Sequence, residues 1–382
     1  MKQNLLPKLP VALAAAVLTL ACIVLLCLCV HPTDPAPAGT TAAKSEGFHT
    51  DLAARLDPFA NNTASTALDG LTYIRKIYTL EPDALSGPKP DPANYGRSKD
   101  PAEVSAVVAR ASELLDGQSL CWNPELELRP DSEIRWYYDE TILVLAWQEV
   151  HNNAVYNYAE VKIAHPSQFR RFIAGNSYGA SVQLPSTAMS AAANAVISSN
   201  GDFYAFRGTG VNVYQGTLYR CDNKLLDTCM IDRSGDLLCL PVGYFPDDAA
   251  AQSFIEEHGV SFSLAFGPTL VTDGTAITST NYPIGEPNQI YARSAVGQLD
   301  SLHYLLMTCG EAGIYKNAAT VVQAAAEMAA KGCRTAYALD GGQTAEIVMG
   351  GEIFNRVVYD SERAVSDIIY FATAIPEEGG AA

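Results

Sequence analysis

The chain has 382 residues, of which 48% are hydrophobic and 18% charged, a composition that suits one large folded domain or two of ordinary size. Its formal net charge of −17 argues against a nucleic-acid-binding protein, whose surface should be basic. The same charge disfavours adhesion to anionic lipid and loose binding of a polyanion. A ligand that carries phosphate would therefore need a local cationic site.

The N-terminal region contains an apolar segment, residues 11–30, which has no charge and is long enough to cross a bilayer as one helix. Lys2 and Lys8 precede it and Asp34 follows it, so the positive-inside rule places residues 1–10 in the cytoplasm. A cleaved signal peptide is the alternative, but the apolar run is long and no small-x-small cleavage site follows it. We expect a single-pass protein of the cell membrane, with the bulk of the chain outside the cytoplasm.

The next segments offer no catalytic constellation. Residues 31–65 are rich in Pro, Ala, Thr and Ser, which predicts a flexible linker. The sequence Asp100-Pro101-Ala102-Glu103 has the form of a capping box with proline at the first helical position, and the helix it opens should end near Gly117. We interpret residues 66–132 as a small helical N-terminal region.

Strand patterns dominate from residue 133 onward. Runs rich in aromatic and β-branched residues occur at 134–138, 141–150, 154–163, 195–199, 263–271, 335–339 and 344–349. Apolar residues on one face predict a helix over 319–331, capped by Gly332. We therefore expect residues 133–376 to form an α+β domain, with a mixed β-sheet core, packed helices and hairpins, before a short tail at 377–382.

Six cysteines lie beyond the apolar segment: Cys121, Cys221, Cys229, Cys239, Cys309 and Cys333. None forms a CxxC pair, so the spacing does not predict a zinc site. Cys229 and Cys239 are evenly placed about the turn Arg233-Ser234-Gly235, a spacing that would let them face each other across a hairpin. A disulfide and a pair of buried free thiols both remain open.

The strand predicted at 335–339 ends on a carboxylate, Asp340. Gly341 and Gly342 follow and allow a sharp backbone turn. A carboxylate at the end of a buried strand is costly to desolvate unless it has a partner or a function, although a satisfied turn aspartate is the alternative. The same order of helix, strand and polar glycine turn occurs earlier in the chain, where the turn is Asn200-Gly201-Asp202. This similarity suggests that two strand ends bring polar groups to one site.

Five short motifs occur in a fixed order: Asn200-Gly201-Asp202-Phe203-Tyr204, Phe266-Gly267-Pro268, Arg293-Ser294-Ala295-Val296-Gly297, Leu339-Asp340-Gly341-Gly342 and Ser366-Asp367-Ile368-Ile369-Tyr370. Together they resemble the bacterial phosphodiester glycosidase family, once labelled exopolysaccharide-biosynthesis-like, over roughly residues 137–376. An animal relative of that family is the lysosomal "uncovering enzyme", which removes N-acetylglucosamine from a phosphodiester on mannose. The resemblance implies a hydrolase that cleaves sugar-1-phosphodiesters at the anomeric carbon.

The resemblance also implies roles for individual residues. Asp340 matches the family's LDGG turn and is the first candidate for a catalytic carboxylate, with Asp202 as a second. Arg293 matches the family's arginine motif and is the natural phosphate or sugar clamp, with a structural salt bridge as the alternative. Further substrate-binding candidates are Asn200, Gly201, Gly341, Gly342 and His303, and Glu346 and Asp300 are possible participants. His303, between Leu302 and Tyr304, can equally be a core histidine.

Two departures from the family pattern keep a second interpretation open. Cys309-Gly310-Glu311 stands where relatives carry Asp-Gly-Arg, and Gln323 stands where the helix often has glutamate. These departures favour a non-catalytic glycan-binding or envelope-assembly protein on the same fold, and a purely structural membrane-tethered domain is a third possibility. The leading interpretation is a membrane-anchored, extracytoplasmic phosphodiester glycosidase acting on envelope or exopolysaccharide glycans.

The expected partners follow from this interpretation. They are a carbohydrate or sugar-phosphate substrate and, through residues 11–30, the membrane, but no nucleic acid. We expect no metal and no cofactor. Calcium is conceivable at clustered aspartates, but no spacing in the sequence amounts to a calcium loop.

Overall fold

The computed structural model describes residues 63–68 and 71–76 by their backbone, and residues 80, 86–179, 182–311, 313 and 315–375 in full. The predicted N-terminal residues 1–10, the membrane segment 11–30, the linker up to residue 62 and the tail 377–382 lie outside this part of the chain. Within the described ranges, no helix has the length and apolar character needed to cross a membrane. The described residues belong to one compact unit.

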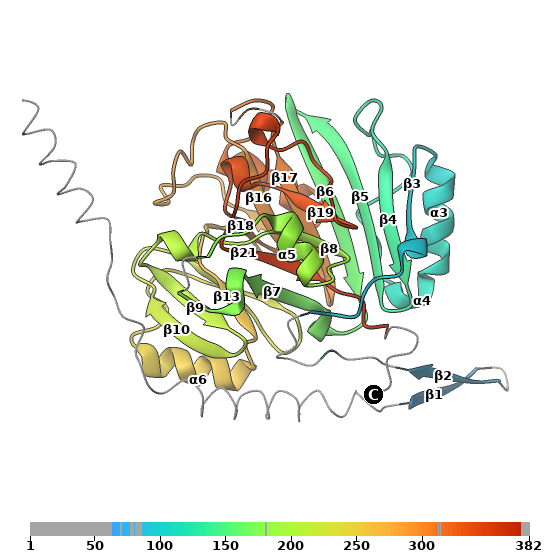
Figure 1. Cartoon of the computed structure of the whole chain (residues 1–382), viewed down its shortest axis with the longest axis horizontal. Helices are drawn as coiled ribbons and strands as arrows, with labels where there is room; N and C mark the ends of the chain where they lie inside the picture. Colours follow the sequence, from blue (N-terminus) through green and yellow to red (C-terminus); the bar gives the residue numbers. More distant parts are fainter. Residues whose placement is uncertain are drawn as a thin grey trace, which may run out of the picture. The chain divides into compact units, whose positions relative to one another are not determined.

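A nine-stranded sheet forms the centre of this unit (Figure 1). In sheet order its strands are β15 (Thr275–Ala276), β14 (Thr269–Thr272), β18 (Thr335–Leu339), β16 (Arg293–Asp300), β17 (His303–Cys309), β6 (Ala154–Ile163), β5 (Ile142–His151), β4 (Ile134–Asp139) and β3 (Tyr95–Ser98). Asn152 and Asn153 turn the β5–β6 hairpin with φ of 49° and 62°, in the left-handed region that a two-residue hairpin turn requires.

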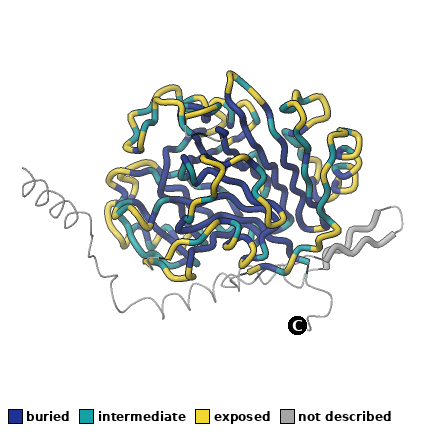
Figure 2. Tube along the Cα trace, turned by 45° about the horizontal axis from the view of Figure 1, so that its top comes forward, coloured by how far each residue is buried: buried dark blue, intermediate teal, exposed yellow. Residues whose placement is uncertain are grey.

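A second sheet of five strands packs face to face against the first. Its order is β20 (Glu352–Ile353), β19 (Ile347–Met349), β8 (Ile197–Asn200), β21 (Asp367–Phe371) and β7 (Phe169–Ile173). The buried core between the sheets is rich in aromatic residues: Phe169 stacks on Phe371 with ring centroids 4.5 Å apart and packs on Tyr304 of β17. Figure 2 shows the strands buried and the connecting loops exposed.

Helices cover the outer faces of both sheets. They are α3 (Pro101–Arg110), α4 (Ser112–Leu115) and α7 (Val321–Ala330) on the nine-stranded sheet, and α5 (Ser186–Ala192) on the five-stranded sheet. The predicted start at Asp100 is confirmed, because its side chain accepts from the Ala102 amide, but Glu103 does not complete a capping box and the predicted helix divides into α3 and α4 at Ala111. At α7, Thr320 and Gln323 form a capping box. Gly332 follows α7 with φ of 92°, as expected for a helix-ending glycine.

Smaller elements complete the unit. They are the hairpin β1 (Thr63–Leu68) and β2 (Leu71–Lys76), the pair β9 (Gly210–Tyr214) and β10 (Thr217–Asp222), the three strands β12 (Leu237–Leu240), β11 (Thr228–Ile231) and β13 (Phe262–Leu264), and helix α6 (Asp248–His258). Short 3-10 turns occur at Pro92–Asn94, Pro166–Gln168, Ala174–Asn176, Tyr204–Phe206, Gly342–Thr344 and Val358–Asp360. In Figure 1, α6 lies beside the β9–β10 pair.

The predicted α+β class with a sheet core is confirmed, but the sheets do not mix parallel and antiparallel strands as expected: every strand pairing within the described ranges is antiparallel. The prediction of a small helical region over 66–132 needs correction. This segment also supplies β1, β2 and β3, and β3 forms the edge of the nine-stranded sheet against β4. A four-residue strand is too short to show an alternating pattern, and Tyr95 anchors it by packing its ring against Tyr137 at 4.6 Å.

Cys229 and Cys239 are direct cross-strand partners in β11 and β12, as their spacing suggested. Both are free thiols, as are the other four cysteines of the described residues. Burial raises the pKa of the Cys229 thiol well above its ordinary value. The structure therefore shows two free thiols, of which Cys229 is buried and Cys239 half-buried.

Candidate functional site

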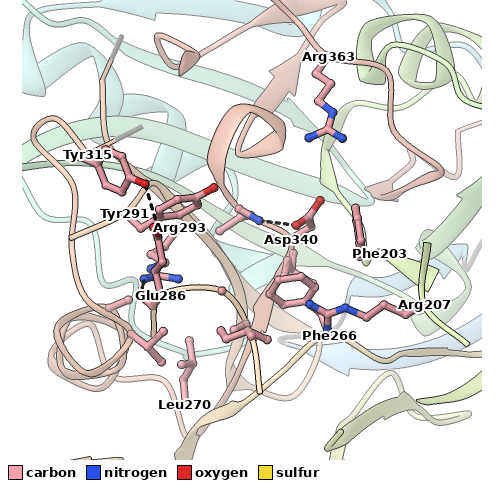
Figure 3. Close-up of a pocket in the computed structure, with 18 residues that line it drawn as sticks. Phe203, Arg207, Phe266, Leu270, Glu286, Tyr291, Arg293, Tyr315, Asp340 and Arg363 are labelled. Carbon is pink, nitrogen blue, oxygen red and sulfur yellow. Dashed lines mark hydrogen bonds between the residues drawn. The ribbon is translucent and has the colours of Figure 1, made fainter. Parts of the chain in front are cut away.

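A pocket of about 360 Å³ opens at the end of β18, within the size range of small-ligand sites (Figure 3). Its walls come from segments far apart in the sequence. Asp340 follows β18, Phe203 and Arg207 follow β8, Glu286 precedes β16 and Arg363 precedes β21. Two paired sheets thus direct several loops toward one cavity.

The backbone of Asp340 is fixed by the end of the neighbouring sheet. The Asn200 side-chain amide donates to the Asp340 carbonyl at 2.6 Å, and the Asp340 amide donates to the Gly201 carbonyl at 3.2 Å. The two strand ends predicted to share one site do meet. Asn200 and Gly201, however, support Asp340 and do not line the pocket themselves.

The side chain of Asp340 is held by its own turn. The Gly341 amide donates to one carboxylate oxygen at 2.9 Å, and the Thr344 hydroxyl donates to the other at 3.0 Å. Burial raises the pKa of Asp340 to about 6, although these hydrogen bonds and the charges of Arg363 and Arg207 oppose the rise. A carboxyl with such a pKa can give or take a proton near neutral pH.

The two glycines after Asp340 serve packing more than direct ligand contact. A Cβ at Gly341 would lie 2.5 Å from the Ala292 carbonyl oxygen, and one at Gly342 would lie 2.8 Å from the Tyr291 hydroxyl. Gly342 also has φ of 70°, which favours glycine. Their amides bond to the Asp340 carboxylate and to the Ala292 carbonyl, and so are not directed at a ligand as the sequence had suggested.

Two arginines that the sequence reading missed flank Asp340 in the pocket. The Arg207 guanidinium lies over the rings of Phe203 and Phe266, at 5.5 and 4.7 Å from their centroids, and Arg363 is exposed. Among the residues the structure describes, neither arginine forms a salt bridge. One terminal nitrogen of Arg207 is buried without a hydrogen-bond partner. Unpaired cations beside a carboxyl are available for an anionic ligand.

Arg293 lines the same pocket, and two of its three guanidinium nitrogens donate to the main chain. It donates to the main-chain carbonyls of Glu286 at 2.7 Å, Gln289 at 3.0 Å and Ala319 at 3.3 Å, and it lies 5.1 Å from the Tyr291 ring centroid. None of these contacts is with a carboxylate, so they do not fit the alternative salt bridge, and the phosphate clamp stays a prediction. Arg293 holds the loop before β16 in place.

Asp202, the second catalytic candidate, is fully buried outside the pocket. Its carboxylate pairs with Arg171 at 3.1 Å and accepts from the Ala265 amide at 2.8 Å. Arg171 also pairs with Asp367 at 2.7 Å, so the three charges form one internal network. The sequence places Asp202 directly after the Asn-Gly turn, but it does not show that the Asp202 side chain points away from the pocket.

The remaining candidates lie elsewhere. His303 contacts Glu160 at 2.8 Å and is buried in β17, which fits the core-histidine alternative. Asp300 is exposed and pairs with Arg334 at 3.1 Å. Glu346 is buried beside Ser186, and burial raises its pKa to about 8. None of the three lines the pocket.

The segment Cys309-Gly310-Glu311, which departs from the family pattern, does not line the pocket. It supports the pocket wall. Glu311 pairs with Arg129 and accepts from the Asn317 side chain at 3.0 Å, so it anchors the loop that carries Tyr315. Tyr315 reaches the pocket wall and donates its hydroxyl to Glu286 at 3.1 Å. Within the described residues, no cluster of three or more His, Cys, Asp or Glu side chains could hold a metal ion.

The fold and the pocket define a two-sheet α+β protein with a protonatable carboxyl beside unpaired arginines. Residues 193–372 match the profile of the phosphodiester glycosidase family, and this range contains every residue that lines the pocket. Residues 193–372 therefore form a domain of the phosphodiester glycosidase family, as the motifs indicated. No curated protein matches the sequence.

Three solved structures are similar to the chain, each at 14% sequence identity. The catalytic domain of zebrafish N-acetylglucosamine-1-phosphodiester alpha-N-acetylglucosaminidase, auto-inhibited by its pro-peptide, has a TM-score of 0.49 over 61% of this chain and 83% of its own. A hypothetical protein from Synechocystis scores 0.47 over 63% and 64%. A Burkholderia pseudomallei protein described as exported scores 0.39 over 86% and 89%.

Proposed function

We propose that this protein hydrolyses sugar-1-phosphodiesters and that Asp340 is a catalytic carboxylate of the reaction. The observation that carries the proposal is one pocket in which a carboxyl with a pKa of about 6 lies beside Arg207 and Arg363. A sugar phosphodiester presents a glycosidic bond to a proton donor and an anion to the arginines. The family of the domain is consistent with this substrate class.

In the proposed reaction, the carboxyl and the arginines of the pocket have different roles. Cleavage at an anomeric carbon passes through an oxocarbenium-like transition state, in which the leaving oxygen gains negative charge. Protonated Asp340 supplies a proton to that phosphate oxygen, while Arg207 and Arg363 hold the phosphate and stabilise its charge. Because the whole chain is strongly acidic, such local cations are what make binding of an anion favourable.

We also propose that residues 11–30 anchor the protein in the cell membrane and present the domain outside the cytoplasm, toward envelope or exopolysaccharide glycans. The uncharged sequence of this segment and the lysines before it support the proposal. In intact cells, external protease should digest the domain, and the protein should remain in the membrane fraction after a salt wash. Protection from protease, or release of the domain into the medium, would contradict it.

The direct test of the activity is release of free sugar from a panel of sugar-1-phosphodiesters. Asp340→Asn should lower turnover by about 10²–10⁴-fold, the usual effect of losing a general acid, without lowering the melting temperature. Asp300→Asn removes an exposed acid outside the pocket and should leave turnover unchanged. Binding of a phosphodiester without hydrolysis by the unsubstituted protein would favour the glycan-binding alternative.

A further inference from the structure

A second carboxylate, Glu286, lines the same pocket as Asp340 on the loop that precedes β16. Nothing in the local sequence marks this residue, because it lies between Gly285 and Pro287 in a stretch without strand or helix pattern. Hydrolysis of a glycosidic bond ordinarily employs two carboxyl groups on opposite sides of the scissile bond. Asp340 alone leaves one of these roles without a residue.

The Glu286 carboxylate is only half satisfied. One oxygen accepts a hydrogen bond from the Tyr315 hydroxyl at 3.1 Å. The other oxygen is buried and has no hydrogen-bond partner among the described residues. Buried carboxylate oxygens are normally hydrogen-bonded, so an unpaired one beside a ligand pocket is available for a water molecule or a substrate hydroxyl.

The backbone at Glu286 is held in an unfavourable conformation. Its φ is 58°, in the left-handed region that a glutamate seldom adopts. The conformation is stabilised because the Glu286 carbonyl accepts from Arg293 at 2.7 Å and from the Gln289 amide at 3.1 Å. Strain that the surroundings maintain in this way is often found where a side chain must be aimed at a ligand.

The two carboxylates line one pocket, around the ring of Tyr291. Burial raises the pKa of the Tyr291 hydroxyl, and the charges of Glu286 and Asp340 both raise it further, so the ring lies near both acids. In the view of Figure 3, Glu286 and Asp340 lie on opposite sides of Tyr291. Arg207 and Arg363 lie on the Asp340 side, where they can hold the leaving phosphate.

We infer that Glu286 is the second catalytic carboxylate of this site and accepts the proton of the attacking water. The inference rests on the proposed glycosidase function. In the hydrolytic step, the water oxygen bonds to the anomeric carbon while the bond from that carbon to the phosphate oxygen breaks. The leaving oxygen keeps the electron pair and takes the Asp340 proton, and Glu286 takes the proton that water loses. Arg293 is then a positioning residue for Glu286.

Glu286→Gln tests the inference because it keeps the size of the side chain but cannot accept the proton. We expect kcat on a sugar-1-phosphodiester to fall about 10²–10⁴-fold while KM changes less than about threefold. Asp360→Asn is the matched control, since Asp360 is an exposed acid outside the pocket that pairs with Arg356. Its kinetic constants should equal those of the wild-type protein.

Chemical rescue separates a catalytic role from a structural one. Adding sodium azide to Glu286→Ala should restore cleavage of the phosphodiester and yield a glycosyl azide in place of the free sugar, because azide needs no base to attack the anomeric carbon. A melting temperature close to that of the wild type shows that each variant is folded, and Glu286→Asp, which keeps the carboxylate, should retain more activity than Glu286→Gln.

Turnover by Glu286→Gln within about threefold of the wild-type rate would overturn the inference and leave the proposed function intact. Failure of azide to rescue folded Glu286→Ala would also overturn it. Absence of turnover by the wild-type protein on every phosphodiester would instead overturn the proposed function, and this inference with it.

Discussion

At the scale of single residues, Asp340 combines features that rarely occur together. It is fixed by Gly341, Thr344 and Asn200, yet burial keeps its pKa near 6. A turn aspartate with a purely structural role would gain most from being fully ionised. The position of Asp340 beside two unpaired arginines is what favours a catalytic role over the structural alternative.

This pKa predicts the pH dependence of the reaction. A general acid must be protonated, so kcat/KM should fall roughly tenfold for each pH unit above pH about 6. The measurement is a pH–rate profile under conditions where circular dichroism shows an unchanged fold. If kcat/KM rose through pH 6, Asp340 would have to act in its ionised form, as base or nucleophile, and the assignment made here would be wrong.

At the scale of elements, the turn after β18 couples the sheet to the pocket. Gly342 has a positive φ and packs directly against the Tyr291 hydroxyl, so a methyl group there meets both backbone strain and a clash. Gly274 has a similar φ of 75° but open space around its Cβ position. Alanine substitutions at Gly342 and Gly274 therefore separate the effect of backbone strain from the effect of a steric clash in the turn.

Gly342→Ala should lower turnover at least tenfold and destabilise the fold by about 1–3 kcal/mol. Gly274→Ala should cost about 1 kcal/mol from strain alone and leave turnover unchanged. Thermal unfolding and steady-state kinetics of the two variants make the comparison. Equal activity in both would show that the turn does not control the geometry of the pocket.

Several secondary-structure elements could be predicted from the sequence, whereas some residues of the pocket could not. Strands β4, β5, β6 and β18, the turn at Asn152 and the helix α7 follow from local periodicity and turn chemistry, and so does the meeting of Asn200 with Asp340. Arg207, Arg363 and Glu286 could not be found in this way, because they lie in irregular loops that only the packing of two sheets brings together.

The incorrect expectations have a related cause. A motif names neighbouring residues but does not give the direction of each side chain. Asp202 follows Asn200 and Gly201 in sequence, yet it turns into a buried network with Arg171. Arg293 lines the pocket, but two of its guanidinium nitrogens bind main-chain carbonyls, which the motif alone did not indicate.

At the scale of the whole molecule, the account depends on how an acidic protein binds an anionic substrate. The net charge of −17 opposes the approach of any phosphate, so specificity must come from the few cations in the pocket. Arg207, with its guanidinium over two phenylalanine rings, is already held in position for that task. The phosphate is therefore the part of the substrate that this site should recognise most strongly.

The measurement that tests the account most directly compares kcat/KM for a sugar-1-phosphodiester with that for the neutral methyl glycoside of the same sugar. The wild-type protein should prefer the phosphodiester by at least about 100-fold, and an Arg207→Gln, Arg363→Gln double variant should lose most of that preference. Equal efficiency on the two substrates, or a preference that survives the double substitution, would contradict the account.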